Sequence, residues 1–158
     1  MKYLWLIPLA LMVIVGSAIA DDITASATVQ KYISVTFNYN SVSFGTVTAG
    51  SSDNHPTPDY TTGVYNVTID TNYAYNVNAY GTDFSDGAGH TFSISNLKMG
   101  VNTTTDFYSF TALSTSSQTI YSGSETDMIN YHAFLLSVPS GQYAGSYSST
   151  VTIDYVNQ

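Results

Sequence analysis

The chain has 158 residues, of which 9% are charged, and it contains neither cysteine nor arginine. Eleven acidic residues against three lysines give a formal net charge of −8, which disfavours nucleic acid and anionic membrane surfaces as partners. Disulfides and thiolate chemistry are excluded, and fourteen tyrosines among many Thr, Ser, Asn and Val residues favour β-strands.

Residues 1–20 have the features of a Sec-type signal peptide. Lys2 precedes an apolar run from Leu4 to Val15, and Ala18-x-Ala20 provides a cleavage site. We therefore predict a secreted or cell-surface protein that begins at Asp21 and has no membrane segment after cleavage. A retained membrane anchor is the alternative, because about 17 uncharged residues can just cross a thin bilayer.

Residues 21–30, the N-terminal arm, are a candidate donor strand. Ile23, Ala25, Ala27 and Val29 alternate with polar residues, and ten extended residues reach ~33 Å. Such a strand can pair within its own sheet or complete the sheet of a neighbouring subunit. Lys31 interrupts the apolar face, so the arm is separable from residues 31–158, which we predict to form one β-sandwich domain.

Alternation of apolar and polar residues continues along residues 31–158, whereas helical periodicity does not. Asp70-Thr71-Asn72 is expected to be a hairpin turn, 98–106 a loop, and 131–138 a central strand because it is apolar on both faces. Short strands divided by Gly, Pro, Asn and Ser predict an all-β fold, an immunoglobulin-like or jelly-roll β-sandwich. The predicted strands cover residues 23–37, 41–47, 64–70, 73–80, 90–96, 107–113, 118–121, 131–138 and 145–156.

No catalytic site is predicted. His55, His90 and His132 are far apart in sequence and lack metal-ligand spacing, so we expect each to have a structural role or none. There is no G-x-S-x-G nucleophile motif, and nothing singles out two of the acidic residues as a glycosidase pair. A secreted hydrolase is the least favoured function.

Three minor sites are also considered. Asp83 and Asp86 in a glycine-containing loop are a candidate calcium site, but a plain solvated hairpin with no cofactor is the favoured interpretation. Asn66 and Asn102 begin N-glycosylation sequons. Asn66 lies on the face opposite Val67 and is expected to point to solvent.

Two segments carry a family resemblance. Ser43 to Ser51 resembles the strand-turn of secreted fimbrial and coat-type β-sandwiches, and Ser140 to Tyr155 resembles their closing strand. With the leader and the N-terminal arm, the arrangement is similar to TasA-type biofilm-matrix fibre proteins and archaeal bundling pilins. The resemblance implies subunits joined by donor-strand complementation. No resemblance covers residues 56–130.

The expected function is a structural subunit of an extracellular filament, such as a pilus or biofilm-matrix fibre, or of a surface layer. Its partners would be copies of itself. The alternative is a carbohydrate-binding or adhesive sandwich that binds surface glycans through exposed tyrosines. The candidates for that role are Tyr60, Tyr65, Tyr80, Tyr108, Tyr121 and Tyr143.

Overall fold

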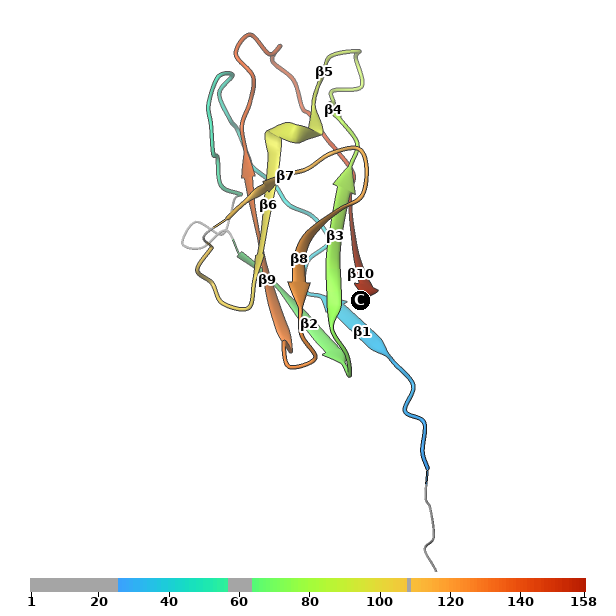
Figure 1. Cartoon of the computed structure of the whole chain (residues 1–158). Coiled ribbons are helices and arrows are strands. Elements are labelled where there is room, and N and C mark those ends of the chain that lie inside the picture. Colours follow the sequence, from blue (N-terminus) through green and yellow to red (C-terminus); the bar gives the residue numbers. More distant parts are fainter. Residues whose placement is uncertain (1–25, 57–63, 108) are drawn as a thin grey trace, which may run out of the picture.

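A computed structural model describes residues 26–56, 64–107 and 109–158 (Figure 1). The predicted leader, together with Ile23, Ala25, Tyr60 and Tyr108, lies outside the described residues. Nearly every described element is a strand, with one 3-10 turn at Ile94–Asn96. No helix in these ranges is long and apolar enough to cross a membrane.

Two antiparallel sheets pack face to face, which confirms the predicted all-β sandwich (Figure 1). The larger sheet consists, in spatial order, of β1 (Ile33–Phe37), β2 (Val64–Thr71), β9 (Ile129–Leu136), β6 (Leu97–Asn102) and β7 (Thr111–Ala112). The smaller sheet consists of β10 (Val151–Asn157), β3 (Tyr75–Gly81) and β8 (Gln118–Gly123). A separate two-stranded hairpin joins β4 (Phe84–Ser85) to β5 (Thr91–Phe92).

The core follows from the alternation of side chains along the strands. In β3, Tyr75, Val77 and Ala79 are fully buried, whereas the residues between them are half-buried. In β2, Val67 and Ile69 face the core opposite the exposed Thr68. Burying each such apolar side chain stabilises the fold by about 1.5–3 kcal/mol, so the inner faces of both sheets hold the sandwich together.

The predicted central strand is confirmed, since β9 is the middle strand of the larger sheet. The Phe107 and Phe110 rings cover the outer face of the larger sheet beside Gly100 of β6, the residue that pairs with Ala133 of β9. A Cβ added to Gly100 would lie 2.9 Å from Phe107 Cδ1 and 3.3 Å from Phe110 Cδ1. The glycine therefore allows these two rings to pack closely on the sheet.

Two predictions about local structure were wrong. Residues 98–106 were expected to be a loop, but Leu97–Asn102 is β6, which pairs with β9 over six residues. Asp70-Thr71-Asn72 was expected to be a hairpin turn, but β2 and β3 belong to different sheets. Asp70 and Thr71 instead end β2, and the chain passes to the smaller sheet after them; no local sequence pattern reports that choice.

Other predicted strands form only in part. Residues 41–47 contain a single bridge at Ser43, 107–113 contains only the short β7, and 90–96 divides into β5 and the 3-10 turn. Of the predicted strand 23–37, the part at 26–32 is not a strand. The half-buried Phe44 and Val47 show that 41–47 uses its alternating residues to line a groove rather than to extend a sheet.

Candidate functional site

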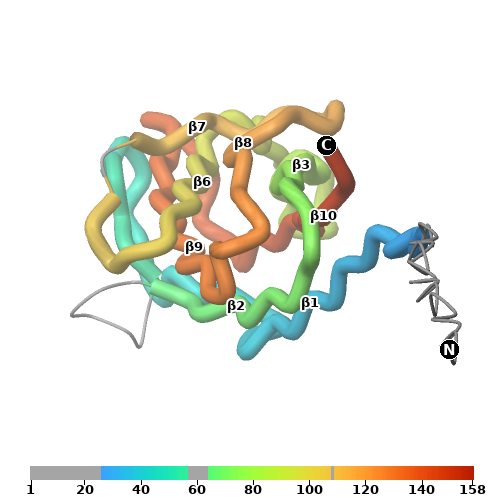
Figure 2. Tube along the Cα trace, turned by 60° about the horizontal axis from the view of Figure 1, so that its bottom comes forward, coloured from blue at the N-terminus to red at the C-terminus, as the bar shows by residue number. Residues whose placement is uncertain are grey.

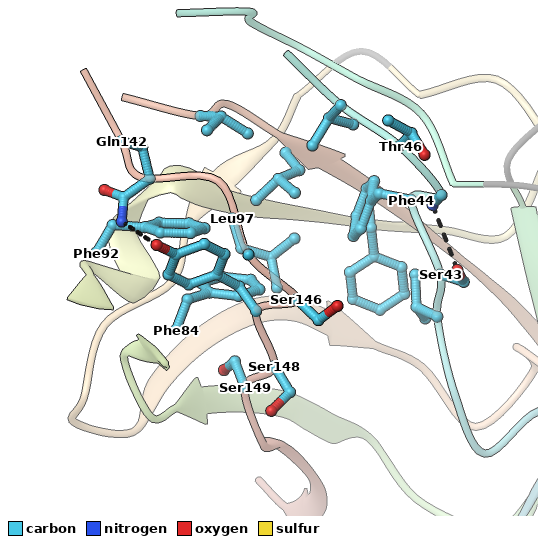
Figure 3. Close-up of a pocket in the computed structure, with 18 of the residues that line it drawn as sticks. Ser43, Phe44, Thr46, Phe84, Phe92, Leu97, Gln142, Ser146, Ser148 and Ser149 are labelled. Carbon is cyan, nitrogen blue, oxygen red and sulfur yellow. Dashed lines mark hydrogen bonds between the residues drawn. The ribbon is translucent and has the colours of Figure 1, made fainter. Parts of the chain in front are cut away.

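A groove of about 750 Å³, with an apolar floor and hydroxyl-bearing margins, opens between residues 41–47 and residues 142–149 (Figure 3). Its floor comes from both β9 and the β4–β5 hairpin. The lining contains no Asp, Glu, Lys or Arg side chain, although the chain carries a net charge of −8. The apolar floor and wall residues include Phe44, Phe84, Phe92, Leu97, Phe134 and Leu136.

The two margins of the groove have backbone groups without partners. Within the described ranges, neither Thr46 on one margin nor Ser146 on the other makes a hydrogen bond. β10 is the terminal strand of its sheet, and its Val151 and Ile153 line the groove. A terminal strand presents a row of N–H and C=O groups that can pair with another chain. The groove therefore combines an apolar floor with backbone available for pairing.

Contacts with the β4–β5 hairpin fix residues 142–149. Ser85 and Ser148 exchange two backbone hydrogen bonds, each 3.0 Å long. Beyond them, the His90 ring stacks on Tyr143 with 4.3 Å between ring centroids. Gln142 Nε2 donates to the Tyr147 hydroxyl at 2.8 Å, as Figure 3 shows. This wall of the groove is therefore held in place before any ligand arrives.

The acidic loop of this hairpin has a structural role. Asp86 Oδ2 lies 2.6 Å from His90 Nδ1, and Asp86 Oδ1 accepts the backbone N–H of Ala88 at 2.8 Å. The hydrogen bond from His90 lowers the pKa of the Asp86 carboxyl. Asp83 Oδ1 accepts the N–H of Ile94 at 2.8 Å. The two carboxylates hold different turns, and no cluster of three metal-ligating side chains occurs in the described ranges, so the calcium hypothesis gains no support.

Residues 26–30, the described part of the N-terminal arm, lead away from the body of the sandwich (Figures 1 and 2). This part is exposed throughout and forms no strand, and Val29 is 80% exposed. Lys31, predicted to break the buried face, is exposed as well. Ala27 and Val29 are thus apolar side chains in solvent.

The base of the arm is fixed. Asn72 Oδ1 accepts the N–H of Tyr32 at 3.0 Å, and Asn72 Nδ2 donates to the Gln30 carbonyl at 2.9 Å. Lys31 Nζ donates to the Gln158 carbonyl at 3.3 Å and lies over the Tyr73 ring. Asn72 thereby makes a pair of bonds that a neighbouring strand would otherwise supply. The turn pattern at Asp70-Thr71-Asn72 did not predict these bonds to the arm.

A buried polar network joins the two sheets. His132 of β9 is fully buried, with Nδ1 2.6 Å from the Tyr39 hydroxyl and Nε2 2.9 Å from the Tyr155 hydroxyl of β10. Asn130 Nδ2 donates to Tyr155, and the Tyr75 hydroxyl of β3 donates to Asn130 Oδ1. Burial lowers the pKa of His132 to about 3, so the ring is neutral. A neutral imidazole has one N–H donor and one acceptor nitrogen. The His132 ring therefore donates a hydrogen bond to one tyrosine hydroxyl and accepts one from the other.

This network could have been suspected from the sequence. Asn130 and His132 occupy the same inward face as Phe134 and Leu136, and a polar residue at such a position requires a partner. His132 thus has a structural role, which agrees with the expectation for the histidines. His55 is exposed.

The sequons and tyrosines have mixed surroundings. Asn66 is half-buried and accepts a hydrogen bond from Asn38 at 3.3 Å, while Asn102 Nδ2 donates to Thr104 Oγ1 at 3.2 Å. Asn66 lies opposite the core-facing Val67, as predicted. Of the four described tyrosines proposed as glycan platforms, Tyr143 is 68% exposed, whereas Tyr65, Tyr80 and Tyr121 are half-buried.

No family model and no curated protein matches the chain. Among solved structures, a family 123 glycoside hydrolase from Clostridium perfringens matches with a TM-score of 0.37 and 16% identity. The match covers 58% of this chain and 18% of that enzyme's chain. A likeness of this size carries no argument about function.

Proposed function

We propose that this protein is a structural subunit of an extracellular filament, assembled when the N-terminal arm of one copy enters the sandwich of the next. One observation supports this most: the arm leaves its own sandwich with Ala27 and Val29 exposed, while its base is fixed by Asn72. An exposed segment with alternating apolar residues and a fixed base is suited to pairing, as an added strand, with another copy.

The energetics define what an acceptor for the arm must offer. Ordering the arm costs about 1–2 kcal/mol per residue. Ladder hydrogen bonds return about 1 kcal/mol each, and burial of a side chain as large as Val29 or Ile23 adds about 1.5–3 kcal/mol. Neither term suffices alone, so the acceptor must offer both free backbone and an apolar surface. An interface between unlike surfaces of identical subunits does not close on itself in general, and it then produces filaments.

The surroundings of the histidines support a structural rather than a catalytic role. Both ring nitrogens of His132 have hydrogen-bond partners in the core. His90 uses Nδ1 to hold the Asp86 loop. The proposed function is therefore structural and uses neither of these two histidines in catalysis.

The test is negative-stain electron microscopy of residues 21–158 and three variants. The wild type should form filaments, and deletion of residues 21–30 should abolish them. Ala27→Asp should also abolish them, since an unpaired carboxylate in an apolar site costs several kcal/mol. Thr28→Asp, its neighbour on the opposite face, is the matched control and should assemble. A deletion variant that still forms normal filaments would refute the mechanism.

A second candidate function is adhesion to surface glycans. The exposed Tyr143, stacked on His90 at one end of the groove, offers an aromatic face of the kind that packs against sugar rings. The test is binding of the purified domain to a glycan array. Binding that is lost in Tyr143→Ala, together with a wild type that forms no filaments, would favour adhesion over polymerisation.

A further inference from the structure

We infer that the groove between residues 41–47 and 142–149 is the acceptor for residues 23–29 of a second copy. This inference rests on the proposed function and adds the site at which the arm binds. It predicts that the bound arm lies along the outer edge of β10, so that the smaller sheet gains a fourth strand.

The charge and length of the arm fit this groove. Residues 23–30, Ile-Thr-Ala-Ser-Ala-Thr-Val-Gln, form an uncharged stretch between Asp22 and Lys31. The groove lining also has no charged side chain. In a chain with a net charge of −8, an uncharged strand is the occupant that avoids burying an unpaired charge.

The shape of the groove fits an alternating strand. Its floor is apolar, which suits the face formed by Ile23, Ala25, Ala27 and Val29. The opposite face of the arm consists of Thr24, Ser26 and Thr28, whose hydroxyls can remain in water at the mouth of the groove. Hydrogen bonds to the arm would use backbone near Thr46 and Ser146, which has no partner within the described ranges.

The position of the groove favours an arm from another copy. The arm leaves the sandwich beside Asn72 and Gln158, at the end away from the β4–β5 hairpin (Figure 1). One end of the groove lies against that hairpin, because Phe84 and Phe92 line it. An arm that points away from its own body would have to reverse direction to enter its own groove. The same direction carries it towards the groove of a copy placed end to end.

The experiment separates donating from accepting. Ser146→Trp places a bulky ring in the groove but leaves the arm intact, so this variant should donate and not accept. Thr46→Arg does the same from the opposite margin. A variant lacking residues 21–30 should accept and not donate. Ser117→Trp, at an exposed serine outside the groove lining, is the matched control and should polymerise like the wild type.

Light scattering coupled to size-exclusion chromatography then measures the assemblies, with circular dichroism to confirm that each variant folds. Ser146→Trp alone and the arm deletion alone should remain monomeric, and an equimolar mixture should give a species of twice the monomer mass. If folded Ser146→Trp and Thr46→Arg both polymerise like Ser117→Trp, the acceptor lies elsewhere while the filament function stands. If the wild type forms no polymer, the proposed function itself fails. A monomer whose arm occupies its own groove would overturn the assignment to a second copy.

Discussion

Acidification should destabilise this protein through the buried imidazole of His132. Burial between the Tyr39 and Tyr155 hydroxyls lowers the pKa of the folded-state ring from 6.5 to about 3. The unfolded chain regains the ordinary value, so below about pH 6.5 the unfolded state binds a proton that the folded state does not. The contribution of the neutral ring is therefore complete above pH 6.5 and is lost progressively as the pH falls toward 3.

The size of the effect follows from the two pKa values. One pKa unit corresponds to about 1.4 kcal/mol, so the loss approaches about 5 kcal/mol at the acid limit and is about 2 kcal/mol between pH 7.5 and pH 5. Most carboxylates remain ionised in this window, so their protonation adds little to the difference between the two pH values. The lowered pKa of Asp86 places its own contribution at still lower pH, where protonation removes the stability that its hydrogen bonds provide.

Urea unfolding of non-polymerised residues 21–158, followed by circular dichroism at pH 7.5 and pH 5, measures this difference. His132→Gln should be less stable at both pH values, yet its free energy of unfolding should change little between them. Equal stability of the wild type at the two pH values, or a slope that survives in His132→Gln, would refute the reasoning.

Three further variants test the packing, each by urea unfolding at pH 7.5. Tyr155→Phe should cost about 1–3 kcal/mol, because it leaves His132 Nε2 and Asn130 Nδ2 without their shared hydroxyl partner in the core. Gly123→Ala should cost about 1–3 kcal/mol or more, since its Cβ would lie 2.7 Å from Tyr75 Cε1. Gly145→Ala is the control and should cost much less, because its Cβ would lie 3.4 Å from the nearest atom. Equal costs for the two variants would contradict the close packing of Tyr75 on Gly123. Lys98→Gln removes a half-exposed ion pair with Asp53 of 3.1 Å and should cost less than about 1 kcal/mol; a larger loss would show that the pair is more than a surface contact.

The sequence predicted the strands whose pattern is local. β2, β3 and β9 each alternate or run apolar over seven or eight residues, and each was expected close to its observed bounds. β6 was missed although Leu97, Met99 and Val101 alternate, and Gly100 weakens the strand pattern at its centre. Only the Phe107 and Phe110 rings, which pack against Gly100, explain why glycine suits that strand.

Of the candidate site, the sequence likewise predicts only the part that is continuous in the chain. The N-terminal arm could be recognised because its alternation, uncharged stretch and ending at Lys31 are continuous in the chain. The groove could not be, since its walls come from residues 41–47, 84–92, 134–138 and 142–153, which only the folded sandwich brings together. The role of Asn72 could not be predicted either, because its partners Gln30 and Tyr32 lie some forty residues away in the chain.

The continuity of the arm with β1 determines how the domain would respond to tension. A pull on the arm acts along the axis of β1, which pairs with β2 in antiparallel register from Ile33↔Thr71 to Phe37↔Val67. Ladder hydrogen bonds run perpendicular to the strands, so such a force loads them together in shear instead of opening them one at a time. The bonds from Asn72 to Gln30 and Tyr32 lengthen this sheared region by one further pair. The domain should therefore withstand more force along its arm than across the sheet.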